Sequence, residues 1–498
     1  MSSLKQLKEQ FVSDLLGGSI EEIYVVTSVA LTSYLAFKLI KGSTLQLPVL
    51  YDFIINVLTI LTAITIYSGN PVTLHYAIII PAVTIFIVSH FIRNSNLNKR
   101  LPKGQRVPES DNSVDDDRDD GAIEVTNTDV LLPKKSFLTA YRSHMLIITN
   151  LCILAVDFNV FPRRFAKVET WGTSMMDLGV GSFVFSMGLV NSRQLIKNYT
   201  EYKFNIKSYF KIIKTNAIKA LPVLVLGIVR FVSVKKLEYQ EHVTEYGIHW
   251  NFFITLGMLP ILTGVLDPLL NLVPRVALAF VFSLLNEYML KKTNMLLFIL
   301  SSENRMDSWV TMNKEGMYSL IGYFTIFLFG QSFGSFVLTS YPTKNNLMLI
   351  GKIRVTRRTS TRLTVTTTQG LIIASLFYQI VFNLVESSKF TTSISRRLAN
   401  FPYILWVVSY NSTLLLGYHL IDKYIPHASN KESFLLDSIN NNGLLIFLLG
   451  NLLTGLVNMT INTLKVSNTV AVGVLIFYSS AWTAVAIYLN RRKVYIKL

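Results

Sequence analysis

The sequence contains a single cysteine, Cys152, among 498 residues. One cysteine cannot close a disulfide within the chain or build a cysteine-rich metal site. Because Cys152 lies inside an apolar run, we expect a buried side chain rather than a catalytic nucleophile. The sequence also has no Walker motif, no Gly-x-Ser-x-Gly elbow and no glycine-rich dinucleotide fingerprint. It therefore carries none of the common signatures of nucleotide-binding proteins or serine hydrolases.

Charged residues are scarce, at 15% of the chain, whereas soluble domains have about 25%. Apolar residues make up 51% and gather in runs of about 20 residues, the length that a helix needs to cross the hydrocarbon core. We therefore predict an all-α, polytopic integral membrane protein with about 13 transmembrane helices in one multi-span domain, residues 1–498. The predicted spans are 20–40, 51–69, 72–92, 138–156, 171–190, 219–234, 250–270, 274–290, 315–338, 369–387, 401–421, 443–463 and 469–489.

The net charge of +17 follows from the topology of such a chain. In a soluble protein this charge would suggest nucleic acid, but here Lys and Arg collect in the segments 191–219 and 339–368 and in the C-terminal RRKVYIKL. With thirteen spans these three segments share one side, which the positive-inside rule places in the cytosol. We therefore expect a lumenal N-terminus, a cytosolic C-terminus, membrane lipids as surroundings and no nucleic-acid partner. The polar N-terminus has no signal-peptide core, so the first span would serve as an uncleaved signal.

Two further expectations follow from this topology. The cytosolic segment 93–137 contains DNSVDDDRDDG and is too polar to bury a core, so we predict a disordered loop. Three Asn-x-Ser/Thr sequons occur, at Asn198 in the cytosol and at Asn411 and Asn458 inside spans, where glycosylation does not reach them. We therefore predict a protein without N-glycans.

One stretch places ionisable groups at the mouth of a span, on the predicted lumenal side. Residues 157–172 read DFNVFPRRFAKVETWG and follow an apolar run directly. Such groups near hydrocarbon are costly and suggest function. A partly desolvated Asp157 can act as a general base, and Lys167 can hold it ionised or stabilise an oxyanion, provided that a turn at the intervening Phe-Pro pair brings them together. The alternative is a helix-end carboxylate that simply reaches water.

Arg163 and Arg164 stand on the translocated side, where arginine is uncommon. A phosphate ligand would explain them, because the guanidinium matches phosphate oxygens; pairing with Glu169 or with lipid headgroups would explain them equally well. A second Arg-Arg-apolar-Ala sequence begins SRRLANFPYILW, at residues 395–406, in the equivalent topological place. This echo reflects either an old parallel repeat or chance.

The predicted lumenal loop 235–253 contains His242, Glu245 and His249, which a helix would place on one face. No His-Glu-x-x-His pattern accompanies them, so we expect no metal site and favour a polar loop that lines a substrate cavity. The residues that we assign to that cavity are His249, Trp250, Asn251, Phe252 and Phe253.

Two classes of protein fit these features. A polytopic transporter of a lipid or an anionic solute usually has ionisable residues deep within broken spans. A membrane enzyme that acts on a lipid headgroup needs them at the interface. Here the charges gather at span ends and in lumenal loops, which favours the enzyme.

Three stretches carry a specific resemblance: AVDFNVFPRRFAKVETWGTSMMDLGVGSFVFSMGLV, LEYQEHVTEYGIHWNFFITL and SRRLANFPYILWVVSYN. They resemble the GPI-anchor inositol acyltransferase family, to which the fungal GPI-anchored wall transfer proteins belong. The likeness runs from LKQLKEQFV near the start to the closing YIKL. The loop 93–135 and the segment 343–368 depart from the family in detail, as expected of variable cytosolic loops. Because 343–368 makes up most of the basic segment 339–368, we predict that this whole segment is a variable basic loop.

The resemblance implies an acyl-CoA-dependent O-acyltransferase of the endoplasmic reticulum membrane. It would transfer a fatty acyl chain, typically palmitoyl, to the inositol 2-hydroxyl of glucosaminyl-phosphatidylinositol, with acyl-CoA as co-substrate and no cofactor. By the same resemblance Asp157 is the base and Lys167 its partner, while Arg163 and Arg164 become phosphate ligands. One tension follows: acyl-CoA is made in the cytosol, whereas the predicted topology places Asp157 in the lumen.

Overall fold

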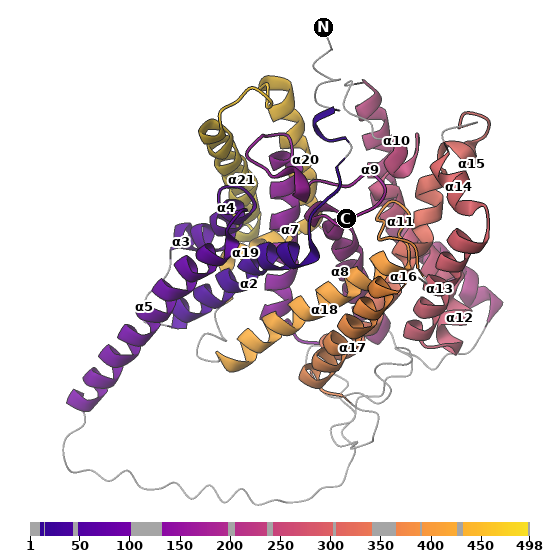
Figure 1. Cartoon of the computed structure of the whole chain (residues 1–498). Helices are drawn as coiled ribbons and strands as arrows, with labels where there is room; N and C mark the ends of the chain where they lie inside the picture. Colours follow the sequence, from indigo (N-terminus) through magenta and orange to yellow (C-terminus); the bar gives the residue numbers. More distant parts are fainter. Residues whose placement is uncertain are drawn as a thin grey trace, which may run out of the picture.

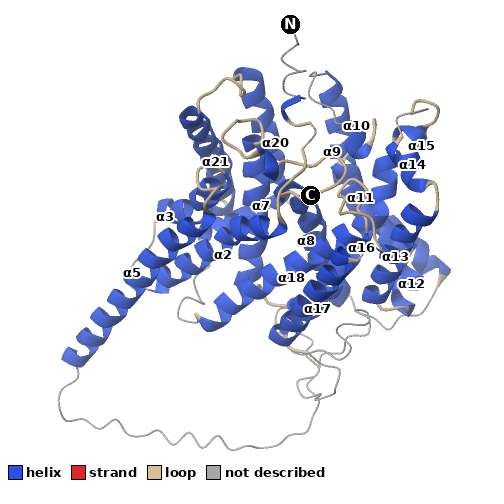
Figure 2. Ribbon diagram, viewed as in Figure 1, coloured by secondary structure: helices blue, strands red, loops and turns tan. Residues whose placement is uncertain are grey.

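The computed structural model describes ten ranges of the chain: 10–13, 15–42, 48–100, 132–197, 205–236, 243–301, 305–340, 365–388, 391–425 and 432–496. Within them the backbone forms helices and connecting loops, without a strand of any length (Figure 2). The one isolated β-bridge pairs Gly17 with Thr173. The predicted all-α class is confirmed.

The helices divide into long and short ones (Figure 1). The long helices are α2 (Ile20–Gly42), α5 (Pro71–Arg100), α7 (Ser136–Ala155), α8 (Met175–Lys197), α9 (Ile206–Lys236), α13 (Arg275–Lys292), α16 (Lys314–Val337), α17 (Thr367–Ser387), α18 (Phe401–Tyr424), α20 (Gly443–Thr460) and α21 (Asn468–Arg491). The short ones are α3 (Val49–Phe53), a π-helix (Ile54–Leu58), α4 (Thr59–Ile64), a 3-10 turn (Arg163–Phe165), α10 (Val243–Tyr246), α11 (Phe252–Val265), α12 (Asp267–Leu272), α14 (Met295–Leu300), α15 (Trp309–Met312) and α19 (Phe434–Asn441).

Nine of the described helices are long and apolar enough to cross a membrane, and Val49–Ile64 and Phe252–Val265 are shorter apolar helices. A multi-pass membrane protein is therefore confirmed. Each predicted span coincides with a helix or a run of short helices, but the number thirteen stays a prediction, because some of these helices are short or carry charge.

The largest difference from the predicted boundaries concerns α9. The predicted span 219–234 is part of a helix that starts at Ile206, inside the segment expected to be a basic loop. Lys207, Lys211 and Lys214 are exposed and spaced four and three residues apart, so they share one helix face and do not interrupt the helix. Long lysine side chains can reach the membrane surface from such positions.

The two predicted cytosolic loops lie mostly outside the described residues. Of segment 93–137, the structure describes only the ends, where α5 continues to Arg100 and α7 begins at Ser136. Of segment 339–368, it describes residues 339–340 and 365–368, the latter including the start of α17. Their predicted disorder and variability stay predictions.

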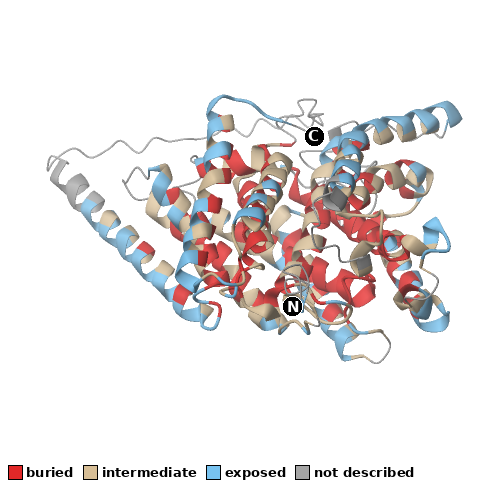
Figure 3. Cartoon of the chain, turned by 90° about the horizontal axis from the view of Figure 1, so that it is seen from above, coloured by how far each residue is buried: buried red, intermediate tan, exposed pale blue. Residues whose placement is uncertain are grey.

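Helix α16 forms the centre of the bundle, and 94% of its most apolar 18-residue stretch is buried. It packs against α8 at very short range: a Cβ on Gly330 would lie 2.2 Å from the carbonyl oxygen of Phe185, and a Cβ on Gly188 would lie 2.2 Å from that of Phe327. Small residues at such a crossing allow two membrane helices to approach closely. Seen from above, buried residues fill the middle and the long rod of α5 projects outward (Figure 3).

Contacts between loops show which segments lie together at each end of the bundle. At one end, the loop after α7 meets the chain before α2 through the Gly17–Thr173 bridge, and Asn159 donates to the carbonyl oxygen of Leu464 before α21. At the other end, Lys134 pairs with Glu432 at 2.7 Å. The segments expected on one side of the membrane thus lie together, which agrees with the predicted pairing of loops. The compartment that each end faces stays a prediction.

Candidate active site

The loop that follows α7 is folded back over the bundle by a series of turns. The amide nitrogens of Phe158 and Phe161 donate to carbonyl oxygens three residues before them, and a 3-10 turn follows at Arg163–Phe165. The side chains of Phe158, Phe161 and Phe165 are fully buried and anchor the loop. The turn that Asp157 and Lys167 require is therefore present, and both side chains line one cavity.

Asp157 stands immediately beyond the C-terminal end of α7 and is half-buried. One of its carboxylate oxygens, Oδ2, accepts a hydrogen bond of 2.7 Å from Asn458 Nδ2 on α20. The same amide group also donates to the carbonyl oxygen of Thr454. Because a hydrogen bond to a carboxylate restricts its orientation, α20 helps to set the direction of Asp157. The sequon residue Asn458 is thus engaged beside the predicted base.

The cavity has a volume of about 380 Å³ and lies between α7, α8, α9, α11 and α20. This volume is within the range of about 300–1,000 Å³ that small-molecule sites occupy. Its charged lining residues are Asp157, Lys167, Glu169, Arg230, Glu245 and Arg396. Its apolar wall includes Ile153, Val156, Phe183, Phe252 and Phe447. One site therefore offers both charges and an apolar surface, as an amphipathic ligand requires.

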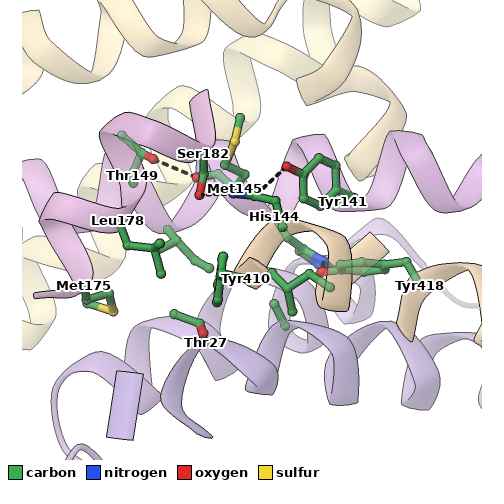
Figure 4. A pocket seen from close by; sticks show the side chains of 15 residues that line it. Thr27, Tyr141, His144, Met145, Thr149, Met175, Leu178, Ser182, Tyr410 and Tyr418 are labelled. Carbon is green, nitrogen blue, oxygen red and sulfur yellow. Dashed lines mark hydrogen bonds between the residues drawn. The ribbon is translucent and has the colours of Figure 1, made fainter. Parts of the chain in front are cut away.

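A smaller cavity of about 30 Å³ lies next to the large one, and Figure 4 shows the side chains that line it. The two share the lining residues Ile148, Thr149, Met175 and Gly179. Deeper in the bundle, His144 hydrogen-bonds to the hydroxyl group of Tyr418 at 2.7 Å. The space is enough for only a few water molecules. The large cavity is therefore the candidate site, and the small one is its neighbour.

Lys167 belongs to a line of charged groups at the edge of the cavity. Its Nζ donates to Glu245 Oε1 at 2.8 Å, and Arg396 Nη1 donates to the same oxygen at 2.8 Å. Arg396 Nε in turn contacts the carboxylate of Asp177 at 2.5 Å. Three segments far apart in the sequence, around residues 167, 245 and 396, thus converge on one side of the cavity.

The two arginines of the 157–172 stretch lie outside this cavity. Arg163 donates to the carbonyl oxygens of Phe158 and Phe161 and stacks on the ring of Phe11, 4.0 Å from its centroid. Burial lowers the pKa of Arg163 to about 10, although the nearby Asp157 opposes this change. Arg164 pairs with Glu22 at 2.7 Å. Both arginines therefore fasten the loop to the N-terminal segment, and their predicted role toward phosphate stays a prediction.

Of the five consecutive residues assigned to a substrate cavity, Trp250, Asn251 and Phe252 line it. Asn251 also caps α11: its Oδ1 accepts from the amide nitrogens of Phe253 and Ile254, and its Nδ2 donates to Gly227 on α9. His249 and Phe253 are not among the described lining residues. His249 instead packs its ring on Phe231, and the buried Phe253 lies near Arg230.

Metal binding finds no support among the described residues. No group of three His, Cys, Asp or Glu side chains within those ranges is placed to hold a metal ion, although His242 falls outside them. Glu245, one of the candidate ligands, is engaged by Lys167 and Arg396. Cys152 is buried, as expected, and lines the large cavity.

Several residues at the site were not assigned from the sequence: Asp177, Arg230, Arg396, Asn451 and Asn458. A signal existed for Arg396, because SRRLANF echoes FPRRFAK. The other residues are an aspartate in an apolar helix start, an arginine within a predicted span and two asparagines of a type common in helix packing. Only their convergence in space distinguishes them.

A helical, multi-pass bundle with a cavity between its helices, lined by both charged and apolar side chains, defines an integral membrane protein with a candidate ligand site. The GWT1 family model matches residues 4–489. The chain is 60% identical to GPI-anchored wall transfer protein 1 of Candida albicans, 53% identical to that of Debaryomyces hansenii and 42% identical to that of Saccharomyces cerevisiae, each over 100% of both chains. The chain therefore belongs to the GWT1 family, which confirms the resemblance seen in the sequence motifs.

Proposed function

We propose that this protein acts in GPI-anchor biosynthesis and transfers a fatty acyl chain, typically palmitoyl, from acyl-CoA to the inositol 2-hydroxyl of glucosaminyl-phosphatidylinositol. The names of its relatives support the coarser part, since they are GPI-anchored wall transfer proteins. The observation that carries the chemistry is the placement of Asp157 and Lys167 together on a cavity with an apolar wall. The transfer requires a base, a cation for an oxyanion and room for an acyl chain.

In the proposed mechanism the inositol hydroxyl attacks the thioester carbonyl directly. Asp157 accepts the hydroxyl proton as the new C–O bond forms, and the Lys167 ammonium stabilises the tetrahedral oxyanion. The intermediate collapses as the C–S bond breaks, and the coenzyme A thiolate leaves and takes the proton from Asp157. The proposed mechanism uses no acyl-enzyme, because the sequence offers no convincing nucleophile for one: Cys152, although it lines the cavity, is a lone thiol within an apolar helix.

We propose that the acyl chain lies along the apolar wall, where Phe252 packs edge-on against Phe183 at 5.8 Å between ring centroids. For the phosphate of the acceptor, Arg230 lines the cavity itself. Arg163 lies next to the cavity. Its guanidinium stacks on Phe11, which directly precedes the lining residues Val12 and Ser13. A lipid headgroup bound at the cavity edge near Val12 and Ser13 would lie close to Arg163 and Arg164. The enzyme is expected in the endoplasmic reticulum membrane, with no cofactor.

The deciding experiment incubates the purified full-length protein in lipid nanodiscs with labelled palmitoyl-CoA and glucosaminyl-phosphatidylinositol. We expect a labelled product whose acyl group is ester-linked to inositol, and no product with Lys167→Ala. If no acylated inositol forms with the unmodified protein, the acyltransferase assignment is wrong. The transporter interpretation would then gain support.

A further inference from the structure

Four charged side chains form a continuous line from the interior of the bundle to the cavity. Asp177 accepts from Arg396 Nε at 2.5 Å, and Arg396 Nη1 donates to Glu245 Oε1 at 2.8 Å. The same Glu245 oxygen accepts from Lys167 Nζ at 2.8 Å. The signs alternate along the line, so each inner charge has an opposite charge on both sides.

Exposure rises steadily along this line. The side chains of Asp177, Arg396, Glu245 and Lys167 are 1%, 4%, 16% and 40% exposed, respectively. Buried charges are held firmly by their partners, because separating them would leave an uncompensated charge away from water. A lysine side chain on its own has many rotamers and loses much entropy when it is fixed. Asp177, Arg396 and Glu245 therefore form a rigid support, and Lys167 is the most exposed of the four at the cavity, which Arg396 and Glu245 also line.

The line also returns to the backbone of the loop that carries Lys167. Asp177 Oδ2 accepts from the amide nitrogen of Val168 at 3.1 Å and from Ser174 Oγ at 2.6 Å. The hydroxyl group of Tyr403 donates to the backbone carbonyl oxygen of Asp177 at 2.8 Å. Since Val168 follows Lys167 directly, the same buried carboxylate holds the backbone beside the lysine and, through Arg396 and Glu245, its ammonium group.

We propose that Glu245, Arg396 and Asp177 are positioning residues that direct the Lys167 ammonium toward the thioester carbonyl of the bound acyl donor. The proposal rests on the function proposed above. A charge already fixed near a developing oxyanion stabilises it more than a mobile one, because nothing has to reorganise during the reaction. Arg396 has a second effect: it shares the negative charge of Glu245, which leaves the lysine less tightly bound and available to the oxyanion.

The test follows the chemical reactivity of one amine in the full-length protein in lipid nanodiscs. An amine-reactive reagent is applied, and modification of Lys167 is quantified by peptide mass spectrometry. Glu245→Gln removes the partner of the lysine, so we expect labelling to rise roughly two- to fivefold, the size of a partly exposed ion pair. Arg396→Gln removes one of the two cations that donate to Glu245 Oε1, so the lysine should be held more tightly and labelling should fall by a similar factor. Arg396→Lys, which keeps the charge, should restore most of the unmodified behaviour.

Kinetics provide the second arm. Glu245→Gln should lower kcat about tenfold, a modest fraction of the effect of removing an oxyanion donor itself. Its KM for palmitoyl-CoA should stay within a factor of about two, because the apolar wall that binds the acyl chain is intact. The matched control is Glu21→Gln, an exposed carboxylate in the first turn of α2 at the same end of the bundle, which should change neither readout.

The outcomes separate the two proposals. If the unmodified protein transfers no acyl chain, the proposed function fails, whatever the labelling shows. If it is active but labelling rises in both Glu245→Gln and Arg396→Gln, these residues only maintain the fold, and the positioning role is wrong. An unchanged kcat in Glu245→Gln overturns it as well.

Discussion

At the scale of single residues, the site depends on the hydrogen-bond and ion-pair partner of each charged side chain. Asp157 and Lys167 lie on the same loop, yet their partners come from elsewhere: Asn458 on α20 for the carboxylate and Glu245 in α10 for the ammonium. An isolated carboxylate or lysine at a span end would simply reach water. The partners instead keep both groups beside the cavity, which is what catalysis by a fixed base and a fixed cation requires.

We predict that Asp157→Asn lowers kcat at least about 100-fold, since a positioned general base contributes roughly 10²–10⁴ in rate. Asn458→Ala should lower kcat roughly tenfold or more, because a hydrogen bond to a charged group is worth about 1.5–3 kcal/mol. The measurement is steady-state acyl transfer in nanodiscs. Asn451→Ala is the control: Asn451 also lines the cavity from α20, but its Nδ2 donates to Phe447 within the same helix. Equal losses in the two asparagine variants would contradict a specific role for Asn458.

At the scale of elements, the loop 157–172 is a partly buried structure that is held at several points. Its phenylalanines are buried, and its end forms a bridge with the segment before α2 at Gly17 and Thr173. Next to the bridge, the Gly172 amide nitrogen donates to the carbonyl oxygen of Ile394, which precedes Arg396. Three distant segments are therefore joined by backbone contacts, so a change in one of them should displace the site.

We predict that Gly17→Ala disturbs the site, whereas Gly18→Ala does not. Gly17 has φ +82°, and a Cβ there would lie 2.1 Å from the carbonyl oxygen of Thr173, so the bridge must open. Gly18 has no positive φ, and a Cβ there would meet only ordinary contacts at 3.4–3.5 Å. Strain of this kind costs about 1–3 kcal/mol, so Gly17→Ala should lower acyl transfer and the thermal unfolding temperature. Indistinguishable behaviour of the two variants in a thermal-shift and activity comparison would count against the bridge as a support of the site.

At the scale of the whole molecule, the helix ends divide into two sets, and the site belongs to the set that includes the start of α2, the end of α7 and the start of α18. The described parts of two basic segments belong to the other set, since Arg193 donates to the carbonyl oxygen of Leu132 and Lys135 donates to that of Thr339. If those face the cytosol, the thioester must be reached through the bundle from the opposite side, or the donor must arrive in the lumen. Within the described residues, the large cavity is the space in which donor and acceptor would meet.

We predict the orientation from this arrangement, and cysteine labelling in sealed, cytosol-side-out microsomes tests it. In a Cys152→Ala background, Asn159→Cys at the site end should react with a membrane-impermeant maleimide only after the vesicles are opened. Lys207→Cys, exposed at the start of α9, should react without opening them. The reverse pattern would place the site in the cytosol and remove the difficulty of donor access.

The same topology predicts that deglycosylation does not change the electrophoretic mobility of the protein. Asn411 is buried, and its side-chain amide donates a hydrogen bond to Ser182.

Much of this protein could be predicted from local sequence because a bilayer imposes simple rules. Every backbone polar group must be satisfied within its own helix, so apolar length alone indicates where helices lie. Because the end of an apolar run marks the end of a span, the positions of Asp157 and Lys167 near a span end could also be predicted from the sequence. Helix α9 was predicted too short, because its lysines looked like a loop although they share one helix face.

The partners of the site were decided by the tertiary structure. Asp177, Glu245, Arg396 and Asn458 belong to four segments that nothing in a linear pattern connects, and each alone resembles an ordinary capping, loop or packing residue. Ion pairs and hydrogen bonds act over about 3 Å, so they depend on how helices pack rather than on spacing along the chain. The sequence by itself therefore determined the membrane class, the helices and the charged loop, and packing of α7, α8, α18 and α20 decided which charges meet and which face the cavity.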